Sequence, residues 1–249
     1  MQRLFNSLLL ITICSMSISS CYFDFDDDGR SPNFINCEEG FGSTVTQEIS
    51  IPDFTGIELT IDAQVYITQG DEQEILVKGQ ENIIDELETR VRNDVWEIEF
   101  DDCVEDSDVL RIFITTPNLT FIGNNGSGKI SSDNILRTDN LEIKNNGSGD
   151  IQLSVEADII NARNVGSGTL ELEGVAATLD VDIRGSGDLE SFDLLVRDAQ
   201  VAIDGSGDAQ VNIQDFLEIM IDGSGDVYYK GSPDLKVTTR GSGKVFNAD

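Results

Sequence analysis

Gly205-Ser206-Gly207 is one of seven copies of the same tripeptide in this chain of 249 residues. The copies begin at intervals of 21, 19, 19, 20, 18 and 18 residues. A nearly constant period close to 20 residues is typical of a solenoid built from one repeated unit. The glycines of the seven copies are Gly126 and Gly128, Gly147 and Gly149, Gly166 and Gly168, Gly185 and Gly187, Gly205 and Gly207, Gly223 and Gly225, and Gly241 and Gly243.

Alternating apolar residues lie on both sides of each triplet. Val201 and Ile203 precede Gly205, and Ala209 and Val211 follow Gly207. A period of two residues indicates a strand with one buried and one wet face. We therefore interpret each triplet as a corner between two strands, in which both glycines permit positive φ and the small serine stacks on its equivalents.

A meander of hairpins would also use glycine at its turns, but it gives no reason for a fixed period. A coil of two or three short strands with turns takes up about this number of residues. The sequence therefore predicts an all-β fold, a right-handed parallel β-helix with coils of about 19 residues. The predicted inward residues are Ile112, Ile114, Leu119, Phe121, Leu141, Ile143, Leu153, Leu172, Val181, Ile183, Val201, Ile203, Val211, Ile219, Ile221 and Val237.

The first residues form an export signal rather than part of the fold. Arg3 precedes a short apolar run at residues 8–13, and small residues lead to Cys21. The run is too short to span a bilayer. The pattern resembles a bacterial lipoprotein signal with its lipobox, which implies that residues 1–20 are removed and that Cys21 carries lipid, including palmitate. The expected membrane contact is through this anchor alone.

Residues 21–43 are predicted to be a flexible tether, because four aspartates between Asp24 and Asp28 are followed by Gly, Ser and Pro. The acidic cluster resembles the tag that sends some lipoproteins to the outer face of the outer membrane, although a plain spacer fits equally well. We expect a lipoprotein of the cell envelope in the outer membrane, and the sequence leaves open whether it faces the surface or the periplasm.

The charge balance excludes several kinds of partner. Without residues 1–20 the chain keeps 15 basic and 47 acidic residues, a formal charge of −32. Such a surface repels nucleic acid and anionic lipid headgroups. The chain has no histidine, so the usual imidazole base and zinc ligand are missing.

Two cysteines remain once Cys14 leaves with the signal and Cys21 is acylated. Cys37 and Cys103, 66 positions apart, are an even pair in an oxidising compartment and a disulfide candidate. Closing a loop of this length would contribute on the order of 4 kcal/mol. The sequence leaves open whether the two thiols meet.

Residues 44–100 show short alternating strands without the triplet. Residues 81–89 place Ile83, Ile84 and Leu87 at helical spacing, which suits a short helix over an open end. Solenoids need an atypical terminal unit of this kind. We expect a β-rich N-terminal cap, with Trp96 in the core rather than on a sugar-binding surface.

The stretches Phe54-Thr55-Gly56-Ile57, Val65-Tyr66-Ile67-Thr68-Gln69-Gly70 and 77–84, together with the triplets, resemble the head GIN domain family. The resemblance covers about residues 45–246. Proteins of this family carry the label of auto-transporter adhesins. The resemblance implies one β-helical, envelope-attached domain over residues 44–249, with Gly-Ser-Gly coils at 110–246. It supplies no catalytic residues, and it favours binding without naming a partner.

Three aspartates form a candidate ion site. Asp188, Asp208 and Asp226 directly follow triplets, so coils stacked about 4.8 Å apart place them in one column. Unit charges at that distance repel by about 0.9 kcal/mol in water. Solvent, terminal lysines and cross-coil pairs such as Arg184 with Asp204 would relieve this, or a calcium ion would. Because the nine-residue calcium repeat is absent, we expect a structural column and no cofactor, with calcium as the weaker alternative.

The regular period also bears on function. β-Helical enzymes that act on polysaccharides wall their clefts with long loops, and intervals of 18 to 21 residues leave no such insertion. We expect a non-catalytic adhesin or binding module that presents a solenoid face, with Tyr228 and Tyr229, to a glycan or protein. The alternatives are a carbohydrate-active enzyme and a structural envelope protein that self-associates. Residues 246–249 are too short to cap the last coil. This coil therefore either frays or is covered by a second chain in a homo-oligomer.

Overall fold

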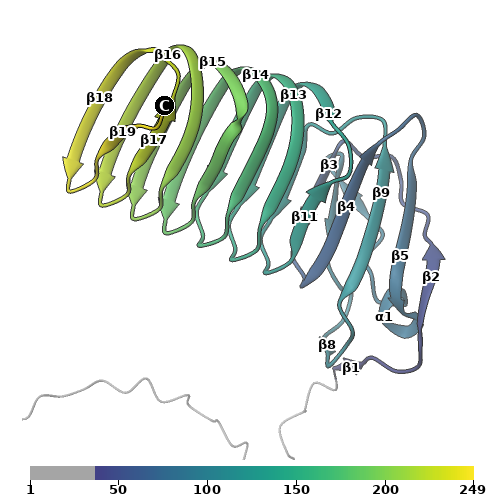
Figure 1. The fold of residues 1–249 in the computed structure, drawn as a ribbon. Coiled ribbons are helices and arrows are strands. Elements are labelled where there is room, and N and C mark those ends of the chain that lie inside the picture. The colour runs from purple at the N-terminus through teal and green to yellow at the C-terminus, as the bar shows by residue number, and fades with distance from the viewer. Residues whose placement is uncertain (1–36) are drawn as a thin grey trace, which may run out of the picture. The chain divides into compact units, whose positions relative to one another are not determined.

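The computed structural model describes residues 37–249, which form one compact unit. The predicted signal peptide, Cys21 and the acidic run of the tether lie outside the described residues. The unit is a nearly all-β parallel solenoid of about seven turns with a spacing of about 19 residues (Figure 1). The predicted fold class is confirmed.

One long strand runs through most of each coil, namely β12 (Leu136–Asn145), β13 (Ile151–Asn164), β14 (Leu170–Gly185), β15 (Leu189–Gly205) and β16 (Ala209–Gly223). Neighbouring strands pair in parallel, and their register places Val181 beside Val201 and Val201 beside Ile219. Equivalent side chains therefore form columns along the solenoid. The last coil consists of β17 (Val227–Lys230), β18 (Asp234–Gly241) and β19 (Val245–Asn247).

The first coils do not follow chain order. β3 (Gly56–Leu59) lies between β7 (Val95–Ile98) and β10 (Phe121–Asn124). Likewise β4 (Ala63–Gln69) lies between β9 (Leu110–Thr116) and β11 (Lys129–Ser132). The predicted start of the Gly-Ser-Gly coils at residue 110 is wrong for β9, which pairs with β4 and β5 of the N-terminal region. After β4 the chain runs through residues 70–94 to the N-terminal side of β3 and β4, where β7 and β9 pair with them. The chain then crosses to the other side of β3 and β4, where β10 and β11 pair with them.

An antiparallel cap closes the N-terminal end, as predicted. β2 (Thr44–Glu48) pairs with β5 (Glu74–Gln80), and β5 pairs with β9. Both pairings are antiparallel. Helix α1 (Glu81–Asp85) buries Ile83 and Ile84 against this end and is shorter than the predicted 81–89. β6 (Val91–Arg92) pairs with β7. Trp96 is fully buried and donates its indole N–H to the Glu88 carbonyl oxygen at 2.8 Å, which confirms it as a core residue.

One residue of the predicted inward set is wrong, and a second is exposed although it lies in an inward column. Phe121 is half-buried with Lys144 Nζ 5.2 Å from its ring centre, because Ile122 is the residue that pairs with Ile57 and points inward. Val237 continues the inward column of Ile219 but is 43 % exposed, because none of the strands described in residues 37–249 lies beyond β18. The other predicted inward residues are buried.

Cys37 and Cys103 are joined by a disulfide. Next to it, β1 (Glu38–Glu39) pairs in parallel with β8 (Val104–Glu105), and Asn82 Nδ2 donates to Glu38 Oε1 at 2.8 Å. The folded unit thus begins at Cys37, earlier than the predicted boundary at residue 44, because these contacts hold residues 37–39 against the cap. None of the helices in residues 37–249 has the length and apolar character needed to cross a bilayer.

Candidate functional site

The corners are held by close backbone stacking. A Cβ atom on Gly207 would lie 2.0 Å from the Gly187 carbonyl oxygen, and one on Gly149 would lie 2.0 Å from the Gly128 carbonyl oxygen. No side chain fits there, because the carbonyl of the preceding corner fills the space. The expectation that both glycines of a triplet use positive φ is wrong for the second glycine, which is required for this close approach instead.

The first glycine distinguishes two kinds of corner. Gly185, Gly205 and Gly223 have φ of 135°, 149° and 146°, and Gly241 also has positive φ, whereas the first three corners do not use this conformation. In those three, a buried asparagine two residues before the triplet spans the corner. The Nδ2 donors are Asn124, Asn145 and Asn164, and each lies 2.8 Å from the carbonyl oxygen of the second glycine, Gly128, Gly149 and Gly168. Sequence reasoning missed this ladder, although the change from Asn to Ile before the triplet at Ile183, Ile203 and Ile221 is visible in the chain.

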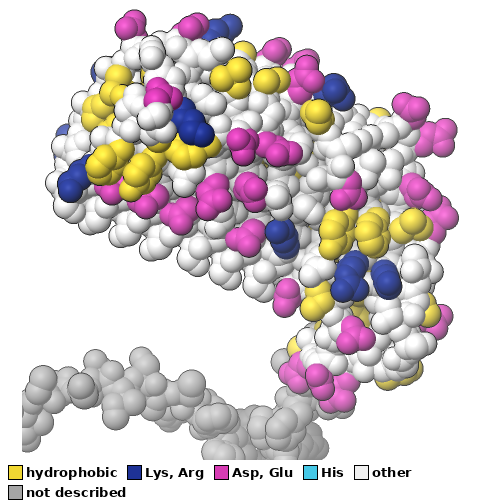
Figure 2. Space-filling view, in the orientation of Figure 1, with side chains coloured by type: hydrophobic (Ala, Val, Ile, Leu, Met, Phe, Trp, Pro, Cys, Tyr) yellow, Lys and Arg dark blue, Asp and Glu magenta, His cyan; other side chains and the backbone are white. Residues whose placement is uncertain are grey.

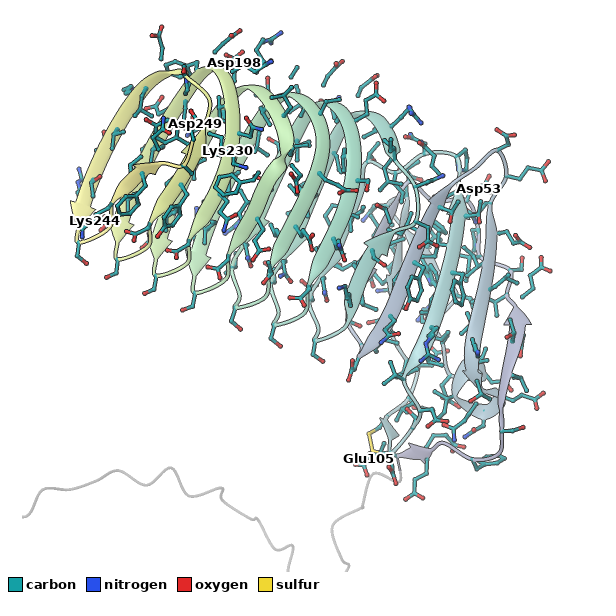
Figure 3. All side chains as sticks on the ribbon, in the orientation of Figure 1. Asp53, Glu105, Asp198, Lys230, Lys244 and Asp249 are labelled. Carbon is teal, nitrogen blue, oxygen red and sulfur yellow. A yellow bond between two sulfur atoms is a disulfide. The ribbon has the colours of Figure 1, made fainter. Side chains whose placement is uncertain are left out.

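The aspartate column forms as predicted in position. Asp208 N–H donates to Asp188 Oδ1, and Asp226 N–H donates to Asp208 Oδ1, both at 2.7 Å. Lys244 N–H donates in the same way to Asp226 Oδ1 at 2.7 Å, at the end of the column (Figure 3). Each carboxylate therefore accepts a backbone hydrogen bond from the next coil, which favours the structural interpretation of the column over calcium.

The predicted ion pair between Arg184 and Asp204 is wrong. The two residues are register partners, but the Arg184 guanidinium lies 2.8 Å from Asp182 on its own strand. Residues two apart on a strand point to the same side, so Asp182 is the nearer partner. Asp182 also lies 3.7 Å from Arg163, and these charges line a shallow groove on the strand segments before the corners.

A continuous row of outward side chains crosses the segments after the corners. We call it the platform row. It starts and ends with stacked aromatic pairs, since the rings of Tyr66 and Phe113 and those of Tyr228 and Phe246 are each 5.1 Å apart. In register order its members are Phe113, Tyr66, Ser131, Gln152, Glu171, Glu190, Gln210, Tyr228 and Phe246.

The two ends of this face are apolar and its middle is acidic. Figure 2 shows hydrophobic side chains gathered over β4, β9 and β5 and over the C-terminal strands, with acidic side chains between them. Near one end, Lys230 Nζ lies 4.4 Å from the ring centre of Phe192 (Figure 3). Desolvation, followed by the charges of Asp226 and Asp208, raises the pKa of the Tyr228 hydroxyl. This hydroxyl therefore stays protonated at neutral pH and remains a hydrogen-bond donor.

Comparison with known proteins identifies the family to which this chain belongs. The family model described as "Putative auto-transporter adhesin, head GIN domain" matches residues 53–233. The chain belongs to the head GIN domain family. The predicted resemblance is confirmed, and the family description indicates a protein of the cell envelope or cell surface.

Solved structures share the whole head GIN fold. A "putative adhesin" from Bacteroides fragilis NCTC 9343 is 25% identical, with a TM-score of 0.80 over 84% of this chain and 99% of that chain. A "putative adhesin" from Parabacteroides merdae ATCC 43184 is 21% identical, with a TM-score of 0.70 over 85% of this chain and 99% of that chain. A "putative lipid binding protein" from Parabacteroides distasonis ATCC 8503 is 23% identical, with a TM-score of 0.68 over 85% of this chain and 99% of that chain. No curated protein matches the chain. The family and these structures are described as adhesin or binding proteins, not as enzymes.

Proposed function

We propose that this head GIN domain protein is a non-catalytic binding module of the outer membrane, anchored by lipid on Cys21, that holds a neutral glycan chain along the platform row. The observation that carries the proposal is the row itself. It offers stacked aromatic rings at both ends and amide, hydroxyl and carboxylate groups in between, all in register.

The dimensions suit an extended chain. Six strand spacings separate Tyr66 from Tyr228, which corresponds to about 29 Å at 4.8 Å for each spacing. Aromatic rings offer an apolar surface on which the flat face of a sugar ring can stack. Gln152 and Gln210 each offer a donor and an acceptor for sugar hydroxyls, and Glu171 and Glu190 offer acceptors.

The charge of the row selects among glycans. Glu171 and Glu190 are register neighbours in the middle of the row, in a chain with a formal charge of −31. This field repels uronic acids, sulfated sugars and other anions. The proposed ligand is therefore a neutral glycan chain rather than an acidic one.

The shape of the row favours binding without catalysis. Glycoside hydrolysis needs an acid and a second carboxylate placed on either side of the bond, with the acid in an environment that raises its pKa. The row is open along its length and carries no long loop between residues 130 and 230. A protein ligand on the same face is the second candidate, because the family is described in terms of adhesion.

The test is an array of neutral glycans, acidic glycans and matrix proteins probed with the soluble chain from Arg30 onward. This chain retains the whole unit of residues 37–249. We expect signals on neutral glycans that are lost in the Tyr66→Ala/Tyr228→Ala double variant. The control Met220→Ala should keep them, because Met220 lies on the strand segment before the corner at Gly223 and not in the platform row. Signals only on proteins would replace the glycan with a protein ligand, and silence on all classes would overturn the binding proposal.

The anchor is tested separately. Cys21→Ala is expected to release the protein from the membrane fraction, because no other lipid attachment site is predicted. Retention of this variant in the membrane would contradict the lipid anchor and leave the glycan-binding test unaffected.

A further inference from the structure

The two ends of the solenoid differ in how far other elements cover them. The N-terminal end is covered by β2, β5 and α1. At the C-terminal end, β18 pairs with β16 along one edge, and none of the strands described in residues 37–249 pairs with its other edge (Figure 1). An open edge presents a row of unpaired backbone N–H and C=O groups, which natural proteins normally cover or blunt.

The side chains of this edge belong to the core. Leu235 and Val237 continue the buried columns of Leu217 and Ile219, yet they are 42 % and 43 % exposed. All eight residues of β18 are exposed. The last coil therefore ends in an apolar surface that continues the core and that no element of residues 37–249 covers.

The charge of the last coil also differs from that of the rest of the chain. Residues 231–249 carry three basic and two acidic side chains, in a protein whose formal charge is −31. A second copy is repelled by most of the surface but not by this end. The same edge of a second copy offers matching backbone groups and a matching apolar surface, so it is the partner that the open edge of β18 fits.

We propose that β18 pairs antiparallel with β18 of a second copy, so that two solenoids join end to end about a two-fold axis at Val237. An interface about a two-fold axis uses the same patch on both chains. With Val237 opposite its equivalent, Leu235 lies opposite Thr239 and Lys236 opposite Thr238. The two apolar cores then continue into each other.

This register is selected by charge. With Val237 on the axis, Asp234 of each copy lies directly opposite Arg240 of the other, which gives two complementary pairs. A shift in one direction places Lys236 opposite itself, and a shift in the other places Lys236 opposite Arg240, so both alternatives bring like charges together. Neither Asp234 nor Arg240 forms an ion pair within residues 37–249, whereas Lys236 is paired with Glu218 at 2.7 Å.

Charge exchange tests the pairing by sedimentation of the chain from Arg30 onward. The wild-type chain is expected to double its mass as concentration rises. Asp234→Arg and Arg240→Asp are each expected to weaken this association at least tenfold, and an equimolar mixture of the two is expected to restore it, because each mismatched copy then meets its complement. A wild-type chain that stays monomeric at every concentration, or a mixture that stays monomeric while the wild type dimerises, would overturn the proposal.

A second measurement does not depend on the charge variants folding. Residues directly opposite in an antiparallel pair have Cα atoms about 4.5 to 5.5 Å apart, within the range of a disulfide. Val237→Cys is therefore expected to form a cross-linked dimer on mild oxidation. The matched control is Thr239→Cys, whose equivalent would lie four residues away along the strand, about 14 Å. Equal cross-linking of both variants, or of neither, would contradict the register.

Discussion

Asn164 Nδ2 donates a hydrogen bond of 2.8 Å to the Gly168 carbonyl oxygen, whereas its register partner one coil later is Ile183. The same corner is thus built in two ways within one solenoid. Where asparagine is present, a side chain satisfies the carbonyl of the turn. Where isoleucine replaces it, the first glycine takes positive φ, as at Gly185. Gly-Ser-Gly occurs in both kinds of corner because the backbones of neighbouring corners stack closely in each of them.

Removing an asparagine from the ladder should cost stability. Asn145→Ala leaves the carbonyl of Gly149 without its donor in a buried site and opens a small cavity. We expect a loss of about 1 to 3 kcal/mol in the free energy of unfolding, measured by urea denaturation. The control is Asn146→Ala at the exposed neighbouring position, which should change stability by less than about 0.5 kcal/mol. Equal losses for both variants would show that the ladder has no special role.

The second glycine of a triplet should tolerate no side chain. Gly207→Ala places a Cβ 2.0 Å from the Gly187 carbonyl oxygen, so the stacked coils must separate locally. The expected loss is about 1 to 3 kcal/mol or more by the same method. Ser206→Ala changes the residue between the two glycines and serves as control, with a small effect. A stable Gly207→Ala variant would mean that the corners are not packed this closely.

The cap should contribute a pH-dependent term to stability. A hydrogen bond from Arg90, which outweighs desolvation, lowers the pKa of Glu88 from 4.5 to about 2, and the hydrogen bond of Asp101 to Glu88 raises the pKa of Asp101. A carboxyl group with a lowered pKa in the folded state stabilises it above pH 4.5, and this contribution is lost as the pH falls toward 2.

Comparison of the wild-type chain with Glu88→Gln isolates that term from the relief of repulsion in a strongly acidic protein. We expect the wild type to be more stable than the variant at pH 6, and the difference to shrink steadily between pH 4.5 and pH 2. The measurement is denaturant unfolding at a series of pH values. A difference that is constant with pH would contradict the role of the Arg90 contact.

The aspartate column should not depend on calcium. Asp188, Asp208 and Asp226 each accept a backbone hydrogen bond of 2.7 Å from the next coil. Addition of a chelator is expected to leave the melting temperature unchanged, whereas Asp208→Ala should cost about 1 kcal/mol, because Asp226 N–H loses its acceptor. A fall of several degrees on chelation would instead establish an ion in the column.

The sequence was sufficient for the solenoid because a repeated corner leaves a period, and the columns at Val181, Val201 and Ile219 follow from it. The sequence did not predict the first coils, because residues 56–69 and 95–116 contain no repeated motif that indicates which strands pair. One end of the platform row could not be predicted for this reason. Tyr66 and Phe113 become neighbours, and Tyr66 becomes the partner of Ser131, only through that crossing.

The central claim, that the platform row is the binding surface, is tested most directly by hydroxyl-radical footprinting with the neutral glycan that gives the strongest array signal. The account predicts reduced oxidation of Tyr66, Phe113, Tyr228 and Phe246 when the glycan is bound, and unchanged oxidation of Phe216, which is 40 % exposed outside the row. Protection of Phe216 without protection of the four platform rings would contradict it.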